Sequence, residues 1–511
     1  MRLNILVGGK AGQGINKISE IISSILSQQG YFTFNYRDYP SLIRGGHNFN
    51  ILSISDKRIG SFETKLDVII ALDEKTIEMH KLELKKSGIL IDYKNFENLG
   101  RNLNIALSGA LIKILGISKD ILIKRTKQEF DNKEALDAAE KGFESQEKKF
   151  ELKNLDNKIS IMTGSRGVAK GAVNSKIDLY LAYPMTPATG LMNELASEQI
   201  KNKIMVFQAE NEISVANAGL GASFAGARTM IGSSGGGFDL MTEAISFQGQ
   251  AEIPLVIYLA ARPGPGTGIP TYSTQSDLNV ALKSGHGEFP RIVVAPGDPI
   301  ECIEKTNEAF YLSEKFGALS IILSDKHLAE SEFSFSNSPN KVFDVNVKRK
   351  LPGSNIVKAT SYEHDEFGNT TEIPEVAKKN ADVRLEKGEK IKKEIENLEI
   401  FKIHGNKNSK NLIVGWGSTK ANILDAMDEI KNLDAKFLQI LYLEPFSDKI
   451  KQELKQAKKI ILIENNSTAQ LGDLIAEKTG ILIEKENQIL RYDGKPFASD
   501  ELKLKIEQKL K

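Results

Sequence analysis

A short apolar run that ends in a glycine- or proline-rich turn and continues into a helical pattern recurs along the whole chain. This recurrence limits the fold more than any other feature, because strands that alternate with helices form open α/β sheets. Apolar runs without polar alternation indicate strands buried on both faces, as in a largely parallel sheet. The expected strands cover residues 3–7, 49–53, 68–72, 88–92, 179–182, 204–208, 255–260, 292–295, 320–323, 411–419, 437–446 and 459–466, and an amphipathic helix covers 15–28.

The same pattern predicts three α/β domains, in line with a length of 511 residues, which is too long for one core. An N-terminal domain covers residues 1–160, and its charged helical stretch at 117–160 is expected to bridge to the next domain. A middle domain covers 161–335. A polar excursion and linker with a run of Lys and Glu cover 336–410, and a C-terminal domain covers 411–511.

Charge and hydropathy argue against two classes of partner. Lys plus Arg number 68 against 67 for Asp plus Glu, so a formal net charge of +1 gives no electrostatic reason to expect nucleic acid or an anionic membrane. No apolar run approaches the ~18–20 residues that span a bilayer, and the N-terminal sequence lacks the apolar stretch of a secretory signal. We therefore expect a soluble, cytoplasmic protein.

Cys302 is the only cysteine of the chain. Its isolation excludes an internal disulfide, a Cys-rich zinc site and an iron–sulfur cluster held by this chain alone, since such clusters normally need about four thiolates. The residue lies in a helical pattern, where a cysteine is usually a packing residue. If the chemistry passes electrons through a cluster, another subunit must carry that cluster.

Two loops of the N-terminal domain are candidate ligand loops. The turn GGKAGQG, with Gly12 and Gly14, follows a strand and opens a helix, where bare N–H groups and the helix dipole favour an anion. Its spacing is neither G-x-G-x-x-G nor a phosphate loop, so a structural turn is an equal alternative. The loop YPSLIRGGHN carries Arg44 and His47, and His47 is as readily a satisfied core or surface group. Gly12, Gly14 and Arg44 are the candidate cofactor-binding residues here.

In the middle domain, polar side chains follow successive strands. One strand ends in a Pro-Met-Thr-Pro loop with Pro184 and Thr186, and the prolines fix the threonine at the carboxyl end of a strand, the usual ligand side. The alternative is a threonine that merely caps the next helix. After a later strand, a rigid loop carries Arg262, Thr267 and Thr271, and the arginine fork suits a carboxylate.

The strand at 204–208 is followed by two carboxylates, Glu210 and Glu212, and by a helix of small residues. A carboxylate at the apolar end of a buried strand is costly to desolvate unless it has a specific partner. The small residues allow another backbone or a ligand to come close, and SSGGGFDLM adds a glycine-rich turn. Glu210, which follows the strand more closely, is the candidate catalytic residue.

These motifs, in this order, resemble the α subunit of the 2-oxoacid:ferredoxin oxidoreductases. The resemblance rests on YPMTP, QAENE, SSGGGFDLMTEAI, AEIPLVIYLAARPGPGTG and EHDEFG. GGKAGQG and YPSLIRGGHN resemble that family's γ domain, here fused ahead of α, and GWGST, LEPF, IENNSTAQL and YDGKPF also fit. The resemblance implies a γ domain, a pyrimidine-binding domain for thiamine diphosphate and a transketolase-C-like C-terminal domain.

The resemblance also implies roles for the candidate residues. In that family the glutamate matching Glu210 hydrogen-bonds N1′ of the aminopyrimidine, which favours the imino tautomer that removes the thiazolium C2 proton. Thr186 and Arg262 match family residues near the substrate's carboxylate, and Thr267 and Thr271 are expected as second contacts. Pro184 is expected beside the cofactor.

A separate β subunit is expected to complete the enzyme. The G-D-G and Asn motif that holds the diphosphate through magnesium in that family is missing, since GDP at 297–299 lacks the following glycine. Magnesium and the iron–sulfur cluster are therefore assigned to the β subunit. The implied reaction converts a 2-oxoacid and coenzyme A to acyl-CoA and carbon dioxide, with electrons passed to ferredoxin, in an αβ pair that dimerises. The fused γα layout favours 2-oxoglutarate, whereas a pyruvate or indolepyruvate enzyme and a non-catalytic scaffold subunit are the alternatives.

Overall fold

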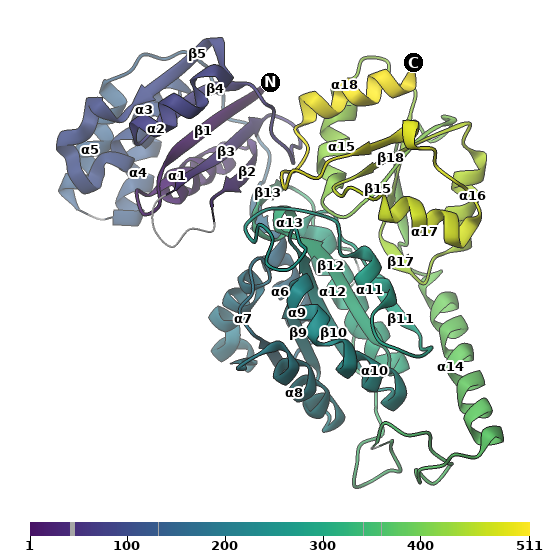
Figure 1. Ribbon diagram of the computed structural model, residues 1–511. Coiled ribbons are helices and arrows are strands. Elements are labelled where there is room, and N and C mark those ends of the chain that lie inside the picture. The colour runs from purple at the N-terminus through teal and green to yellow at the C-terminus, as the bar shows by residue number, and fades with distance from the viewer. Residues whose placement is uncertain (41–45, 131, 341, 359) are drawn as a thin grey trace. The chain divides into compact units, whose positions relative to one another are not determined.

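The computed structural model describes residues 1–511 except 41–45, 131, 341 and 359. The chain forms two compact units (Figure 1). Within the described residues there are three sheets, two with seven strands and one with five, which agrees with the expected α/β class. Unit 1 comprises Met1–Met162, Ser331–Asn337 and Ala498–Leu502, and unit 2 comprises Thr163–Glu330, Ser338–Phe497 and Lys503–Lys511.

Unit 1 is built on a sheet with the strand order β5-β4-β1-β3-β2-β13-β6. β1 pairs parallel with β4 and antiparallel with β3, so this sheet is mixed. The isoleucines of α1 are buried against it, as the amphipathic pattern predicts. The elements are β1 (Arg2–Lys10), α1 (Ile15–Gln28), β2 (Phe32–Asp38), β3 (His47–Ser55), β4 (Leu66–Ala71), α2 (Glu74–His80), β5 (Leu84–Asp92), α3 (Leu103–Ile114), α4 (Lys119–Phe130), α5 (Lys133–Glu144), β6 (Ser160–Thr163) and β13 (Glu332–Phe335), with short 3₁₀ helices at Lys81–Glu83 and Tyr93–Asn102.

The charged stretch at 117–160 contains helices, as expected, but these helices do not bridge two domains. α5 packs against α3 and buries Ala135 and Ala139 in the core of unit 1. The approach is close because α5 carries Gly142, where an added methyl group would stand 1.9 Å from the carbonyl oxygen of Ala106. Small apolar residues on one face were too sparse among the charges to reveal this packing in the sequence.

Replacing Gly142 by alanine is expected to destabilise unit 1 by about 1–3 kcal/mol, because the methyl group forces α3 and α5 apart. Urea denaturation followed by circular dichroism measures the change. Gly221→Ala is the matched control, since Gly221 also lies in a helix but has no atom within 4 Å of the added methyl group. The control should leave the denaturation midpoint unchanged or raise it slightly. Equal midpoints for the two variants would contradict the packing described.

The middle sheet, in unit 2, has the strand order β17-β11-β12-β10-β9-β7-β8. Its paired strands are parallel except β17, which runs antiparallel to β11. The elements are α6 (Gly164–Asn174), β7 (Leu179–Ala182), α7 (Thr189–Asn202), β8 (Met205–Gln208), α8 (Glu212–Phe224), β9 (Thr229–Ser233), α9 (Gly235–Leu240), α10 (Thr242–Ala251), β10 (Leu255–Ala261), α11 (Leu278–Lys283), β11 (Arg291–Val294), α12 (Pro299–Phe316), β12 (Leu319–Asp325), α13 (Lys326–Glu330) and β17 (Tyr442–Glu444).

Helices cover both faces of the middle sheet (Figure 1). Ile257 and Leu259 of β10 join a core that includes residues of α8 and α10. Successive side chains of a strand point to opposite faces, so the intervening Tyr258 faces the other side, where α12 packs on β10 and β12. Cys302 of α12 is fully buried, in agreement with a packing role.

The C-terminal sheet has the strand order β14-β16-β15-β18-β19. The segment 336–410, expected as an excursion and linker, also contains a long helix and a strand. The elements of this part are α14 (Pro374–Ile395), β14 (Phe401–Gly405), β15 (Asn411–Trp416), α15 (Thr419–Asp428), β16 (Lys436–Ile440), α16 (Asp448–Gln456), β18 (Lys459–Glu464), α17 (Gln470–Thr479), β19 (Gln488–Leu490) and α18 (Ser499–Leu510), with a 3₁₀ helix at Lys485–Asn487.

None of the helices in the described part of the chain combines the length and apolar character that a bilayer-spanning segment needs.

A buried cluster of charged side chains connects the middle and C-terminal parts of unit 2. Glu301 of α12 is 1% exposed and binds Lys420 at 2.5 Å and Lys402 at 2.9 Å. Its second oxygen accepts hydrogen bonds from Gln439 and from the backbone N–H of Gly297. Burial alone would raise the pKa of the Glu301 carboxyl, but the two lysines outweigh burial and lower it. The carboxylate is therefore held charged between the two parts.

Candidate active site at the carboxyl ends of the middle sheet

The strand order of the middle sheet creates a switch point between β7 and β9. The chain passes from β7 outward to the edge strand β8 and then returns to β9 on the other side of β7. In open α/β sheets, ligands bind where the loops after two such strands diverge, outside the carboxyl ends. The loops that follow β7 and β9 therefore define the candidate site.

Two predicted substrate residues meet at this edge. Arg262, directly after β10, donates a hydrogen bond of 2.9 Å to the carbonyl oxygen of Thr186 in the loop after β7. Pro184 is half-buried in the same loop. Burial lowers the pKa of the Arg262 guanidinium, while the charges of Asp277 and Glu212 oppose that shift. The structure thus brings Thr186 and Arg262 together, although through the threonine backbone rather than its hydroxyl.

Glu210 does not lie in the dry environment that the sequence predicted. β8 is the edge strand of the sheet and is largely exposed, with Met205 64% and Phe207 52% exposed. The Glu210 carboxylate is exposed and accepts a hydrogen bond from the Ser214 hydroxyl, which lowers its pKa. The apolar residues of β8 suggested a buried strand, but a four-residue run cannot distinguish a central strand from an apolar edge.

Glu212 is the buried carboxylate of the pair, only 4% exposed. It begins α8, directly after Asn211, whose side chain caps the helix by accepting from the N–H of Ser214 at 2.9 Å. Among the described residues, the Oε1 atom of Glu212 has no hydrogen-bond partner. An added methyl group at Gly237 would stand 2.5 Å from that oxygen, so the glycine-rich turn packs directly on the carboxyl. A buried carboxylate oxygen without a partner is costly and indicates a missing donor.

Other polar atoms of the same edge are also buried and, among the described residues, lack partners: the hydroxyls of Ser234 and Thr271 and the Oδ2 atom of Asp277. Thr267, by contrast, is exposed in its loop. Ser234 belongs to the glycine-rich turn singled out in the sequence. Asp277 was missed, because an aspartate before a helix is usually a cap.

The predicted residues of the N-terminal domain belong to unit 1. Gly12 and Gly14 both have a φ of +88°, and the turn is closed by Gln13, whose side chain accepts from the N–H of Lys10 at 2.6 Å. This internal contact fits the structural alternative for the turn. Arg44 lies outside the described residues. His47 is buried with its Nε2 atom 2.8 Å from that of His80, as expected for a core group.

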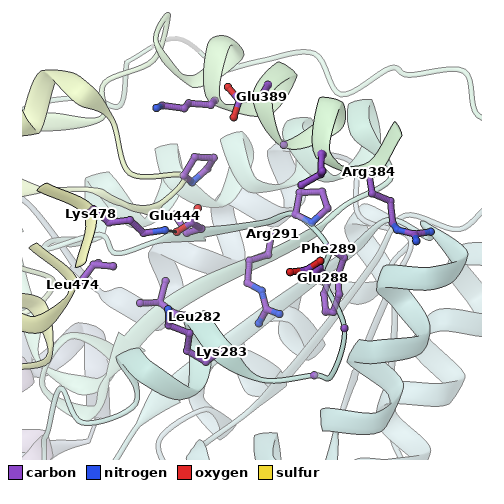
Figure 2. A pocket seen from close by; sticks show the side chains of 17 residues that line it. Leu282, Lys283, Glu288, Phe289, Arg291, Arg384, Glu389, Glu444, Leu474 and Lys478 are labelled. Carbon is purple, nitrogen blue, oxygen red and sulfur yellow. Dashed lines mark ion pairs between the residues drawn. The ribbon is translucent and has the colours of Figure 1, made fainter. Parts of the chain in front are cut away.

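A pocket of about 470 Å³ lies at the amino end of β11, away from the carboxyl-end loops (Figure 2). Its cationic lining is already engaged. Lys478 pairs with Glu444 at 2.9 Å, and Arg384 pairs with Glu363 at 2.7 Å. Arg291 donates hydrogen bonds to the backbone carbonyl oxygens of Ala281 and Ser284. We therefore assign the chemistry to the switch-point loops and not to this pocket.

Two family models match the chain. The model described as "Pyruvate flavodoxin/ferredoxin oxidoreductase, thiamine diP-bdg" matches residues 170–399, and "Pyruvate ferredoxin/flavodoxin oxidoreductase" matches residues 4–98. The first range contains the switch-point loops with Thr186, Glu212 and Arg262. The site therefore lies in a thiamine diphosphate-binding domain of an oxidoreductase.

Similar proteins narrow this class. Subunit alpha of 2-oxoacid:ferredoxin oxidoreductase 1 from Sulfurisphaera tokodaii is 29% identical over 98% of this chain and 97% of its own length. Subunit KorA of 2-oxoglutarate synthase from Methanocaldococcus jannaschii is 29% identical over 65% of this chain and 94% of its own length. The solved 2-oxoglutarate:ferredoxin oxidoreductase from Magnetococcus marinus, with 2-oxoglutarate, coenzyme A and succinyl-CoA bound, is 25% identical, with a TM-score of 0.89 over 100% of both chains. The chain belongs to the α subunits of the 2-oxoacid:ferredoxin oxidoreductases.

Proposed function

We propose that this chain supplies one half of the active site of a 2-oxoacid:ferredoxin oxidoreductase that oxidises 2-oxoglutarate and coenzyme A to an acyl-CoA and carbon dioxide. The observation that carries the proposal is the buried Oε1 atom of Glu212, which has no hydrogen-bond partner in the described part of the chain and lies at the switch point of a thiamine diphosphate-binding domain. Electrons pass to ferredoxin through the assembled complex, and we place the complex in the cytoplasm.

The polar atoms of the switch point fit the aminopyrimidine end of thiamine diphosphate. Glu212 presents an oxygen without a partner among the described residues, and Ser234 and Thr271 present buried hydroxyls that can donate or accept. The bound cofactor supplies the electron sink that decarboxylation of a 2-oxoacid requires. Glu212 would hold a proton at ring nitrogen N1′, a role that needs a carboxyl shielded from water.

Burial favours Glu212 over Glu210 for this role. Glu210 is exposed and already engaged by Ser214, whereas Glu212 has no such partner in the described chain. A hydrogen bond in a dry site is stronger than one in water, so the same chemistry is more effective at Glu212. Glu210 stays the alternative, since a partner subunit that covers β8 would also shield it.

Arg262 and Thr186 support binding of the 2-oxoacid carboxylate. Arg262 is anchored on the Thr186 carbonyl by one Nη atom, which leaves other N–H groups of its fork available for a carboxylate. Thr271, with a buried hydroxyl, is the better second contact of the two loop threonines, because Thr267 is exposed. We also propose that Pro184 lies beside the cofactor and that Gly12, Gly14 and Arg44 contribute to cofactor binding, with a structural turn at Gly12 and Gly14 as the alternative.

A β subunit completes the proposed site. The chain has one cysteine and no G-D-G diphosphate motif, so the magnesium site and the iron–sulfur cluster are assigned to that subunit. The exposed edge of β8, with Met205 and Phe207, offers an apolar surface beside the site for it to cover. We propose an αβ pair that dimerises.

The substrate choice is tested with the assembled complex. Steady-state rates of ferredoxin reduction are compared for pyruvate, 2-oxobutyrate, 2-oxoglutarate and branched 2-oxoacids, and the highest kcat/KM is expected for 2-oxoglutarate. The chain without its β subunit should reduce no ferredoxin; turnover by the chain alone would overturn the half-site proposal. A highest kcat/KM with pyruvate or an indolepyruvate would support the runner-up enzymes. Absence of thiamine diphosphate from the purified complex would support a scaffold subunit.

A further inference from the structure

Three sequence motifs of the C-terminal sheet, to which the proposed reaction assigns no role, contact one segment of the middle domain. The motifs are GWGST at the end of β15, IENNSTAQL at the end of β18 and YDGKPF after β19. Because β18 pairs parallel with both β15 and β19, the three motifs lie at the same edge of the C-terminal sheet. They contact residues 273–279, which lead from the loop after β10 into α11.

Gln275 is the centre of this contact and is only 1% exposed. Its backbone N–H donates to the carbonyl oxygen of Asn465 at 2.7 Å, and its side-chain oxygen accepts from the N–H of Asn465 at 2.9 Å. Its Nε2 atom donates to the carbonyl oxygen of Trp416 at 2.8 Å, and its carbonyl oxygen accepts from the side chain of Asn466 at 3.1 Å. Gly417 leaves room for this approach, since an added methyl group there would stand 3.1 Å from Nε2. The C-terminal sheet therefore fixes both the backbone and the side chain of Gln275.

The residues on both sides of Gln275 are held in the same way. The backbone N–H of Ser273 donates to the carbonyl oxygen of Gly494 at 2.8 Å. The side chain of Gln470 donates to the carbonyl oxygen of Ser276 at 2.8 Å. Buried hydrogen bonds of this kind are costly to break, because the groups would be left without partners away from water. We call residues 273–276 the clamped segment.

The clamped segment lies between two polar side chains of the candidate site. Thr271 precedes it, and the threonine hydroxyl is buried without a partner among the described residues. Asp277 follows it directly, and an added methyl group at Gly235 of the glycine-rich turn would stand 2.5 Å from the Oδ2 atom of Asp277. That oxygen, too, is buried and lacks a partner in the described part of the chain. Buried polar atoms without partners at both ends indicate that the segment faces a ligand.

We propose that Gln275 is a positioning residue of the 2-oxoacid site, through which the C-terminal sheet contributes to substrate binding. The inference rests on the proposed function and adds a role for the C-terminal domain to it. A fixed backbone presents the Thr271 hydroxyl to the substrate carboxylate without the entropic cost of ordering a loop. When Gln275 is released, the hydroxyl also occupies positions out of reach of the carboxylate. Substrate affinity then falls more than the rate of the chemical step, which depends on Glu212.

The test replaces Gln275 by methionine, which keeps the length of the side chain and removes its hydrogen bonds to Trp416 and Asn465. KM for 2-oxoglutarate, measured with the assembled complex at saturating coenzyme A, is expected to rise about tenfold, the effect of weakening one hydrogen bond to a charged group. We expect kcat to fall by less than about threefold, since the proton-transfer group is unchanged. Amide hydrogen exchange of residues 271–277 should become faster.

Gln439→Met is the matched control, because Gln439 is also a buried glutamine between the middle and C-terminal parts of unit 2. Its side chain donates to Glu301 at 2.6 Å and lies 3.1 Å from the Nε2 atom of His404, and both partners lie outside residues 271–277. The control should lower stability but leave KM and the exchange of residues 271–277 unchanged. An unchanged KM in Gln275→Met, or the same rise of KM in both variants, would overturn the proposal.

If Gln275→Met does not assemble, Gln470→Met decides. This variant removes only the contacts with the carbonyl oxygen of Ser276 and the N–H of Asn279, so a smaller rise of KM is expected, and an unchanged KM overturns the proposal. An unmodified complex that turns over no 2-oxoacid would show instead that the proposed function is wrong. Hydrogen exchange needs no turnover, so the role of Gln275 in fixing residues 271–277 is measured in either case, and the two failures are distinguishable.

Discussion

Replacing Glu212 by glutamine is expected to lower turnover of the assembled complex by about 10²–10⁴-fold, the range that a positioned proton-transfer group contributes. Glutamine keeps the size of the side chain, so the contact with Gly237 and the start of α8 are preserved. It cannot hold or release a proton at N1′. Ferredoxin reduction at saturating 2-oxoacid and coenzyme A measures the loss, and the bound thiamine diphosphate content of the complex checks that the variant still takes up the cofactor.

Glu210→Gln is the matched comparison, two residues away. The exposed Glu210 carboxylate loses only its hydrogen bond with Ser214, so turnover should fall by less than about tenfold. A severe loss in Glu210→Gln together with near-normal turnover in Glu212→Gln would return the catalytic role to Glu210. That result would mean that the β subunit creates the dry environment around β8.

Replacing Lys420 by alanine is expected to destabilise unit 2 by about 3–5 kcal/mol, the cost of breaking a buried ion pair from one side. Lys420 is 6% exposed and lies 2.5 Å from both Glu301 and Asp298. Its loss leaves Glu301 buried with Lys402 as the remaining cation. Urea denaturation followed by the fluorescence of Trp416, the one tryptophan, measures the change in the C-terminal sheet.

The stability lost in Lys420→Ala should be largest near neutral pH and should decrease in acid. The folded pKa of Glu301 lies below its ordinary value of 4.5, so the carboxylate contributes stability above that pH, and the contribution is lost as pH falls through the folded pKa. The difference in free energy of unfolding between the unmodified protein and Lys420→Ala should therefore become smaller below about pH 4.5. Lys407→Ala, at an exposed loop position, is the control and should have no measurable effect. An equal midpoint for both variants would contradict a structural role for the pair.

The strands that the sequence predicted well are the ones whose apolar run is bounded by clear turn residues. The expected 179–182 coincides with β7, and the helix at 15–28 coincides with α1. The expected strand at 437–446 is instead two strands, β16 and β17, that belong to different sheets. The apolar run is continuous through Leu441, and local periodicity carries no information on which sheet a strand joins.

The sequence predicted which loops form the candidate site, but not which of their carboxylates are buried. Thr186 and Arg262 were found because proline and glycine mark the ends of buried strands. The choice between Glu210 and Glu212 needed the position of β8 at an edge, which depends on strand order across the whole sheet. Asp277 could not be distinguished from a helix cap, because only the three-dimensional structure shows its carboxyl turned toward Gly235.

The late strand β17 also has a consequence for how the protein is made. β11 pairs with β17, so one side of the middle sheet stays unpaired during synthesis until Tyr442 has left the ribosome. At ~5–20 residues per second, the wait after β12 lasts on the order of ten seconds. An unpaired strand edge is a site for wrong association. The nascent chain is therefore most open to aggregation, and most dependent on chaperones, in the interval between the synthesis of β12 and that of β17.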